Sequence, residues 1–499
     1  MSIELLLKPE AMNQSNPSTP MSREEIRAVY AQGEGAVIAL IEGLSERIGQ
    51  LETHLETLEN HRKKDSRNSS KPPSGDGFAK RTKSLRQKGE RSSGGQNGHP
   101  GSTLEWSEKV DEVVVHPVLQ CQSCGQDLQD VAVESWGLRQ VHDLPPLRLI
   151  VREHQSQEKR CPCCGVLNQA NFPVDVNSVV QYGSGLKGLM VYLMSGQLLP
   201  SSRVCDLLRE VVGCKLSEGT LYNACAQCDE QLKPIEQPLK SALQQAEVGH
   251  FDETGMRVGG KLMWLHVACT EALTYYFIHP KRGQLAMDAM DILPHFSGTS
   301  IHDGWSSYAH YECEHGLCNA HHLRELLFVV ERYQQQWADE MMTLLVEIKT
   351  QVEMAKAAGL DALSATQIAR FEQQYQTLLE QGLKDNPPPP TNPNALPSRG
   401  RPKQSPPKNL LDRLSKQSAV LAFMYDFRVL FDNNQAERDL RMMKLRQKIS
   451  GGFRSLEGAQ SFCRIRGYIS TLRKQGMDVL DALKQVFKGN LIFPALQPE

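Results

Sequence analysis

Three acidic residues, Asp252, Asp303 and Glu437, have the types and the predicted positions of a metal-binding site. We expect Asp252 on the first, central strand of a sheet and Asp303 at the C-terminal end of the fourth strand. That edge is where open α/β sheets keep their sites. Glu437 would join them from a helix that comes later in the chain. Two aspartates and a glutamate suit Mg²⁺, a hard cation that binds few carboxylates and leaves positions for water and phosphate oxygens.

Such a site could catalyse phosphoryl transfer. Two Mg²⁺ or Mn²⁺ ions about 3.5–4 Å apart stabilise the attacking and leaving oxygens of an in-line displacement. No protein nucleophile is needed, because water or a DNA 3′-hydroxyl attacks. A single aspartate is more often a helix cap or a surface charge, but an unpaired charge within or beside an apolar strand is costly. Glu253 follows Asp252 on the opposite face of the strand, so only one of the two points to the site.

Glu437 lies on an unusually basic helix that is predicted to start at Asn433, with Asn433 and Asn434 as positioning residues. Arg441, Lys444 and Lys448 follow Glu437 at spacings of four, three and four, so all lie on one face. Apolar residues on the other face indicate that the helix packs on a core. An exposed pair between Glu437 and Arg441 adds only about 0.3–0.5 kcal/mol. Ion pairing therefore explains little of this pattern.

The elements that must position these residues are predicted in the order β-β-β-α-β-α-β-α. Three antiparallel strands followed by parallel strands with crossover helices predict a ribonuclease-H-like domain. The strands are expected at 247–255, 261–270, 273–280, 299–308 (ending in a loop) and 316–320, and the helices at 283–296 and 321–357.

We expect an α/β multidomain chain, because 499 residues are enough for about three domains. The expected parts are a disordered N-terminus (1–36), a coiled coil (37–60), a basic flexible linker (61–104), a zinc-binding, zinc-ribbon-like module (105–178), a helical, helix-turn-helix-like DNA-binding region (179–240), the ribonuclease-H-like catalytic core (241–329 and 425–455), a helical and Pro-rich insertion (330–424), and a C-terminal helical region (456–499).

The composition is typical of a cytoplasmic protein that contacts a polyanion. The net charge is −2, yet residues 61–100 and 399–454 each carry a net charge of +8. No signal peptide is recognisable at MSIELLLKPEAMNQ, and no apolar run is long enough to cross a membrane. The 13 cysteines are therefore expected in a reducing compartment, where close pairs indicate metal ligands.

The N-terminal third has two features with open interpretations. Residues 61–104 are either a solvated tether or a nucleic-acid-binding arm. Before them lies an apolar seam that forms either a dimeric coiled coil or a helix packed on its own domain. The seam alternates spacings of four and three, at Val37, Ile41, Leu44, Ile48, Leu51, Leu55 and Leu58.

Two Cys-x-x-Cys pairs, Cys121 with Cys124 and Cys161 with Cys164, could hold one structural Zn²⁺ in a tetrahedral site. A glycine follows each pair and suits a tight turn. Cys163 is the spare thiol. The gap between the pairs is longer than in common zinc ribbons, so an additional hairpin is expected.

Residues 201–213 and 216–232 form two predicted helices around Gly213. They would be either a helix-turn-helix or a plain helical hairpin. The preceding YGSGLKG matches a dinucleotide-binding fingerprint only in letters, because helical patterns follow it instead of a βαβ unit.

Several motifs resemble those of the insertion sequence 66 family of DDE transposases, over about Val37 to Lys488. They are GHFDETG, IHDGWSSY, LCNAHHLREL, FDNNQAERDLRMMKLRQKISGGFRS, the linker's SRNSSKPPSGDG and the two cysteine pairs. The Asn-Asn-x-Ala-Glu-Arg element at 433–438 is the most specific of them. Leu430 departs from the pattern, since many relatives have proline there.

The resemblance implies that Asp252, Asp303 and Glu437 are the metal-binding catalytic triad of a nuclease that cuts element ends and joins them to target DNA. Double-stranded DNA, a second copy of the chain and small accessory proteins of the same element would be its partners. Cys318 and His321 could instead hold a second zinc, but the resemblance favours phosphate contact by His321 or Arg324. The implied DNA contacts are Arg438, Arg441, Lys444, Lys448, Arg454, His321 and Arg324.

Two other functions fit the same modules. A DNA-binding regulator would keep them without catalysis, but three anions facing phosphate without metal would not help it bind DNA. A ribonuclease-H-like nuclease that only hydrolyses would use the same metal site.

Overall fold

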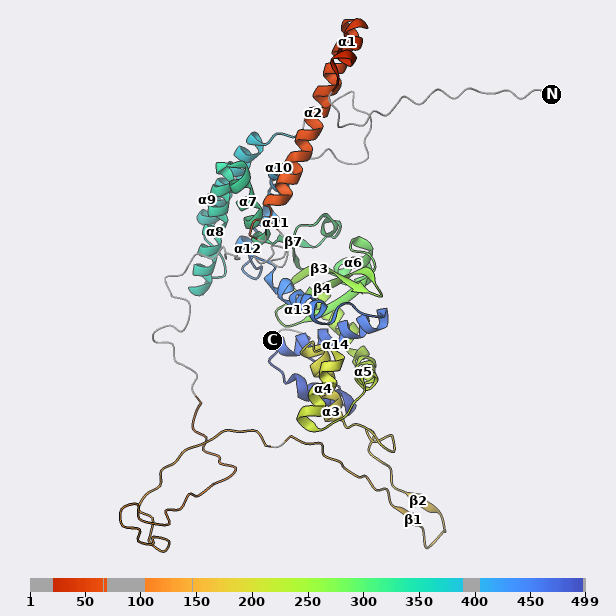
Figure 1. Cartoon of the computed structure of the whole chain (residues 1–499), viewed down its shortest axis with the longest axis vertical. Helices are drawn as coiled ribbons and strands as arrows, with labels where there is room; N and C mark the ends of the chain where they lie inside the picture. Colours follow the sequence, from red (N-terminus) through yellow and green to blue (C-terminus); the bar gives the residue numbers. More distant parts are fainter. Residues whose placement is uncertain (1–20, 66, 70–103, 146, 389–403, 497–499) are drawn as a thin grey trace, which may run out of the picture.

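The computed structural model describes residues 21–65, 67–69, 104–145, 147–388 and 404–496 (Figure 1). The first twenty residues, most of the predicted linker and the Pro-rich part of the insertion lie outside the described residues. No helix in the described ranges is both long and apolar enough to span a bilayer.

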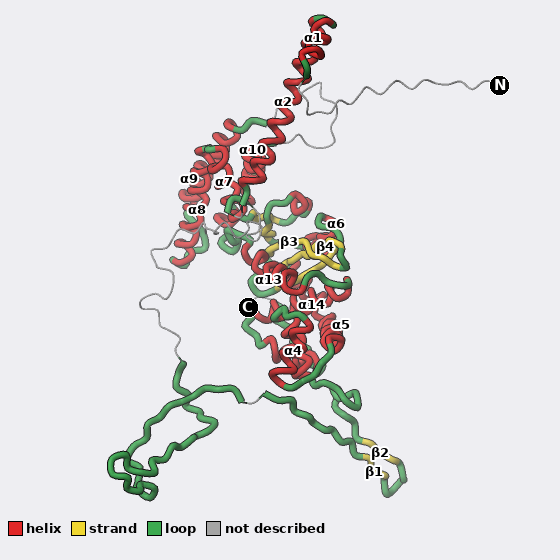
Figure 2. Tube along the Cα trace, in the orientation of Figure 1, coloured by secondary structure: helices red, strands yellow, loops and turns green. Residues whose placement is uncertain are grey.

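A five-stranded mixed sheet forms the centre of the molecule (Figure 2). Its strand order is β5-β4-β3-β6-β7, with β3, β4 and β5 antiparallel and with β6 and β7 parallel to β3. The predicted mixed α/β class is confirmed. The strands are β3 (Val248–Val258), β4 (Lys261–Cys269), β5 (Thr274–His279), β6 (Thr299–His302) and β7 (Glu314–Leu317).

The connections of the sheet follow from local sequence, with one difference from prediction. Gly259 and Gly260 both have positive φ (55° and 76°), as the tight β3–β4 hairpin requires. Helix α6 (Gln284–Met290) links β5 to β6. The predicted element order has an α-helix between β6 and β7, whereas the residue range predicted for this segment (299–308) is a strand that ends in a loop. In the structure β6 ends at His302, and only the short 3₁₀ helix η4 (Ser306–His310) lies between β6 and β7. Buried Tyr308 anchors this short connection.

Helix α13 (Asn434–Ser450) covers one face of the sheet. Its apolar side, with Ala436, Leu440 and Met443, packs in one core with Met256 of β3. Phe251 of the same strand packs on the opposite face, edge-on to Phe296. This alternation decides which β3 side chains meet α13.

The chain is helical before the sheet and again after α13. The predicted helices around Gly213, a residue with φ of 66°, are present as α4 (Ser201–Val212) and α5 (Glu218–Gln244). They pack with α3 (Ser184–Val191) and the C-terminal α15 (Val479–Phe487), while α14 (Leu456–Lys474) packs on α5 and β5.

The insertion forms a helical unit above the sheet in Figure 1, and its core includes Ile301 of β6 and Leu317 of β7. The single helix predicted for 321–357 is wrong, because Gln334 adopts a left-handed conformation (φ 53°) and ends the first helix. The chain reverses there, and Trp337 becomes fully buried in the insertion core. The helices are α7 (Asn319–Tyr333), α8 (Gln336–Ala357), α9 (Ala365–Asp385), α10 (Pro406–Leu414), α11 (Gln417–Val420) and α12 (Ala422–Tyr425).

The N-terminal region contains more structure than predicted. Helix α1 (Arg23–Ala31) lies inside the range 1–36 for which disorder was predicted, and a capping box between Ser22 and Glu25 starts it. Helix α2 (Glu34–Lys63) covers the predicted coiled coil and the first residues of the predicted linker. It projects away from the sheet (Figure 1). Residues 105–178 contain one regular pair of strands, β1 (Glu158–Arg160) and β2 (Leu167–Gln169), within their described part.

Candidate active site

Asp252 and Asp303 lie side by side at one edge of the parallel strands. In the register of β3 and β6, His250 pairs with Ile301. Asp252 lies two residues beyond His250, and Asp303 two residues beyond Ile301, so the two acids are at the same level of neighbouring strands. The backbone N–H of Trp305 donates to Asp303 Oδ1 at 2.8 Å and fixes its side chain in the loop after β6.

Glu437 reaches the same place because Asn433 anchors the start of α13 to the sheet. The side-chain amide of Asn433 donates to the backbone oxygen of Phe251 (2.8 Å), and its Oδ1 lies 3.0 Å from His250 Nδ1. The backbone N–H of Asn433 donates to the Cys318 sulfur (3.2 Å). Glu437 begins the next turn, with its N–H bonded to the Asn433 oxygen.

The three carboxylates are close enough to influence one another. Burial raises the pKa of Asp252 well above its ordinary value, and the charges of Glu253, Asp303 and Glu437 raise it further. Such a cluster is stable as three anions only beside a cation. Glu437 supports this argument, because its buried Oε1 accepts no hydrogen bond. The types of these donors suit a hard divalent cation. Their carboxylate oxygens do not all lie within 4.8 Å of one another among the described residues, so the three acids do not yet form a closed ligand set.

Three side chains that can carry positive charge lie near Glu437 but do not neutralise it fully. His321 Nε2 and Arg324 Nη2 are 3.9 and 3.8 Å from Glu437 Oε1, the outer limit of an ion pair. Arg441 Nη2 is 3.9 Å from Oε2 and is largely exposed. His321 also has a buried Nδ1 without a hydrogen-bond partner. Burial and the Arg324 charge lower the pKa of His321, so the ring is held neutral.

Cys318, His321 and Glu437 offer a second set of ligands. Within the part of the chain that the structure describes, they are the one group of three such residues whose ligand atoms all lie within 4.8 Å. Burial raises the pKa of the Cys318 thiol to about 12. In the metal-free protein Cys318 is thus a neutral acceptor for the Asn433 N–H. The alternatives of a second zinc and a site-lining role both remain compatible with these contacts.

Glu253 points away from the acid cluster, as strand alternation requires. Its carboxylate accepts a hydrogen bond from Tyr308 (2.7 Å) and pairs with Arg282 (2.7 Å) on the opposite face of the sheet. The Arg282 guanidinium also lies over the Trp305 ring, 4.1 Å from its centre. This partner set was not predicted, because nothing in the spacing of these residues indicates that they meet.

Most of the predicted DNA contacts are exposed on or after α13. Arg438, Arg441, Lys448 and Arg454 face solvent. Lys444 is tied to the sheet, since its ammonium donates to the Gly255 oxygen (3.0 Å).

A cation that we did not single out, Arg446, is held between two aromatic rings instead of on the basic face. Its guanidinium lies 3.7 Å from the centre of the Phe453 ring and 4.8 Å from that of Phe462. Burial lowers the pKa of Arg446 to about 10. Arg446 and its ring partners thereby fix the segment that follows α13.

Each predicted cysteine pair lies in a preformed turn. The N–H of Cys121 bonds the oxygen of Gln126, and Cys161 repeats this contact with Val166. Backbone N–H groups of each turn donate to the first sulfur, chiefly those of Cys124 and Cys164, and lower the pKa of Cys121 and Cys161. This geometry fits metal-binding thiolates.

The two turns do not meet in this structure. The loop that carries the first turn and the β1–β2 hairpin that carries the second lie apart (Figure 1), and the four sulfurs form no cluster of ligands among the described residues. Apolar side chains before and between them, such as Val113, Val141 and Val151, are exposed. No apolar core holds the described part of this segment together. A zinc shared by all four cysteines therefore stays a prediction.

The protein has a mixed α/β fold with a cluster of acids at one edge of its parallel strands. Residues 180–461, more than half of the chain, match the family model of the Transposase IS66 family, and the chain belongs to that family. Residues 15–105 match a family of unknown function (DUF6444). A search of curated proteins found no match. Membership makes the chain a transposase, an enzyme that binds, cuts and transfers DNA and whose family uses divalent metal.

The Asn433→Ala variant tests how α13 is anchored. It should lower the free energy of unfolding by about 2 kcal/mol, because it leaves the Phe251 oxygen and the His250 ring buried without their partner. Gln435→Ala is the matched control, since its side chain bonds only exposed Arg438. Urea unfolding measures both. Equal stability of the two variants would contradict the anchoring role.

The raised pKa of Asp252 predicts a pH-dependent stability. A raised folded-state pKa means that the neutral acid stabilises the metal-free fold at low pH. This contribution is lost as pH rises from the ordinary value of 3.8 towards the folded-state pKa. Asp252→Asn should therefore reduce the fall in melting temperature of the metal-free protein as pH rises above about 4. It should also abolish the rise in melting temperature on adding Mg²⁺. A full Mg²⁺-dependent rise in the variant would show that Asp252 is not a ligand.

Proposed function

We propose that the chain is the DDE transposase of a bacterial insertion sequence. Its ribonuclease-H-like core would cut DNA at the ends of the element and transfer the strands to target DNA. The observation that carries the proposal is the convergence of Asp252, Asp303 and Glu437. They come from segments up to 185 positions apart in the chain, and Asp303 and Glu437 both raise the pKa of Asp252.

Asp252, Asp303 and Glu437 are the proposed ligands. When bound, two Mg²⁺ or Mn²⁺ ions would supply charge stabilisation for the attacking and leaving oxygens. Asp303 is oriented by the Trp305 N–H and Glu437 by the turn that Asn433 begins, and metal binding would draw their carboxylates together. Neutral His321 and charged Arg324 lie beside Glu437 and would contact the scissile phosphate.

The basic face of α13 is the proposed path of the DNA backbone away from the site. Phosphate contacts of this kind position DNA without reading its sequence. Recognition of the element ends would fall to the helix-turn-helix-like helices α4 and α5 and to the zinc module. The exposed seam of α2 would join two copies of the chain. The proposed backbone contacts are Arg438, Arg441, Lys444, Lys448 and Arg454.

Asp303→Asn and Glu437→Gln test the catalytic proposal. Each should lower Mg²⁺-dependent cleavage of a duplex bearing the terminal repeat by more than about 100-fold, since even loss of a residue that supports a metal ligand costs 10–100-fold. Binding of the same duplex should change little, because neither acid contacts phosphate without metal. Cleavage assays and gel-shift titrations measure the two effects. Undiminished cleavage by either variant would refute the triad.

The zinc proposal has a separate test. The purified protein should contain one zinc per chain, and Cys121→Ser combined with Cys124→Ser should lose it. The control Cys163→Ser changes the spare thiol and should keep it. Elemental analysis measures the metal directly. A zinc-free wild type, or zinc retained by the double variant, would count against a shared four-cysteine site.

A further inference from the structure

The end of α2 and the residues after it are attached to α7, although sequence analysis assigned them to a flexible linker. Asn60, Asp65, Asn68 and Ser69 are all buried. We call residues 59–69 of the described chain the latch. Its burial needs an explanation, because asparagine, aspartate and serine are buried only where hydrogen bonds satisfy them.

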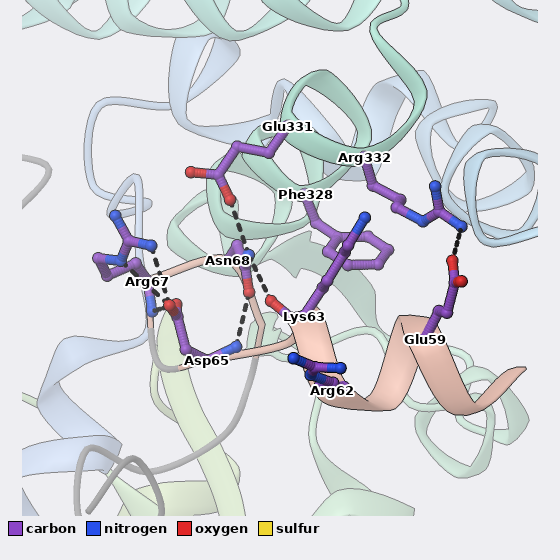
Figure 3. A pocket seen from close by; sticks show the side chains of 9 residues that line it. All are labelled: Glu59, Arg62, Lys63, Asp65, Arg67, Asn68, Phe328, Glu331 and Arg332. Carbon is purple, nitrogen blue, oxygen red and sulfur yellow. Dashed lines mark hydrogen bonds and ion pairs between the residues drawn. The ribbon is translucent and has the colours of Figure 1, made fainter. Parts of the chain in front are cut away.

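Asn68 is the centre of the latch (Figure 3). Its Nδ2 donates to Glu331 Oε2 of α7 (2.8 Å) and to the Lys63 oxygen (3.1 Å), and its Oδ1 accepts from the Asp65 N–H (2.8 Å). The Lys64 ammonium lies 5.1 Å from the centre of the Phe328 ring of α7. Asn68 thus closes the turn after α2 and joins that turn to α7.

A second set of contacts lies one turn earlier on α2. Asn60 Nδ2 donates to the Tyr333 hydroxyl (3.1 Å), and Asn60 Oδ1 accepts from Arg332 Nε (3.2 Å). Arg332 also pairs with Glu59 at 2.7 Å. A cleft of about 620 Å³ remains between the latch and α7, lined mainly by charged side chains. The latch therefore connects α2 to α7 through polar contacts and not through a shared hydrophobic core.

Helix α7 is also part of the candidate active site. Its first turns carry His321 and Arg324 beside Glu437, and its last turns carry Glu331 and Arg332 in the latch. One rigid helix of 15 residues thus joins the catalytic centre to the base of α2. The orientation of α2 is consequently defined relative to the acids.

The seam of α2 has the pattern of a two-stranded coiled coil. Its exposed members Ile41 to Leu58 keep 48–58% of their surface accessible. β-Branched residues at a with leucine at d favour two strands. In a parallel pair, Arg47 at g faces Glu52 at e of the partner subunit, so the charges are complementary. The a positions are Ile41, Ile48 and Leu55, and the d positions are Val37, Leu44, Leu51 and Leu58.

We propose that α2 joins two copies of this chain in a parallel, in-register coiled coil, and that the latch transmits this geometry through α7 to the catalytic core. Both centres then lie at the same end of the coil. An antiparallel pair would separate them by about the 45 Å length of α2. The arrangement would hold two DNA ends together. That last step rests on the proposed transposase function, whereas the parallel coil and the latch do not.

Disulfide trapping tests the orientation in the full-length protein. Leu58→Cys lies at the C-terminal end of the seam, so a parallel pair should form an intermolecular disulfide under mild oxidation. A mixture of Leu58→Cys and Val37→Cys chains tests the opposite orientation and should form no mixed disulfide. Wild-type protein gives the background from the native cysteines. A mixed disulfide without the Leu58→Cys homodimer would overturn the parallel arrangement.

The oligomeric state tests the partner. Light scattering should give twice the 55.9 kDa mass of one chain. Leu44→Lys with Leu51→Lys should halve this mass, because both side chains are exposed in the single chain and buried in the pair. A monomeric wild type, or a variant that stays dimeric, would refute the proposal. Neither result depends on catalysis, so a loss of cleavage in Asp303→Asn leaves this test unaffected.

Hydrogen exchange tests the latch. Asn68→Ala should speed amide exchange in residues 61–69 and at the end of α7 at least tenfold, with the dimer mass and the Leu58→Cys disulfide unchanged. Glu46→Ala, at an exposed position away from both seam and latch, is the control. Under the proposed function, Asn68→Ala should also reduce paired cleavage of two ends more than cleavage of a single end. Unchanged exchange in Asn68→Ala would show that the latch does not hold α2.

Discussion

The buried side chain of Asn433 is the contact on which the candidate site depends. It holds the start of α13 against β3 through Phe251 and His250, and its backbone reaches Cys318 at the start of α7. Asn433 thereby holds together β3, the start of α7 and the start of α13, which are far apart in the chain. A buried amide is suited to this task, because it donates and accepts at once and is costly to leave unpaired.

The same arrangement creates an electrostatic problem that a cation would resolve. Two adjacent acids of β3, Asp252 and Glu253, have different surroundings. Glu253 is compensated by Arg282 and Tyr308 on one face, whereas Asp252 faces two further carboxylates on the other. A fold that gives one buried acid a cationic partner and leaves its neighbour without one concentrates negative potential beside Asp252. That is the physical basis for proposing metal there.

Helix α7 connects the N-terminal helix α2 to the acid cluster. His321 and Arg324 at one end approach Glu437, and Glu331 and Arg332 at the other end hold the latch. The insertion supplies the helices packed behind α7, through the core around Trp337. On this view the insertion supports the link between the N-terminal helix and the catalytic core.

Local patterns were enough to predict the five strands along the chain, the helix carrying Glu437 and the edge at which Asp252 and Asp303 lie, because apolar periodicity and strand alternation are properties of neighbouring residues. They did not predict the break at Gln334, the pairing of Glu253 with Arg282, or the burial of Asn60 and Asn68. Each of these depends on a partner far away in the chain. The sequence by itself determined which residues could bind metal and which helix could dimerise. Only the tertiary structure decided what surrounds them, since burial and hydrogen bonding of polar groups are set by contacts that no local spacing encodes.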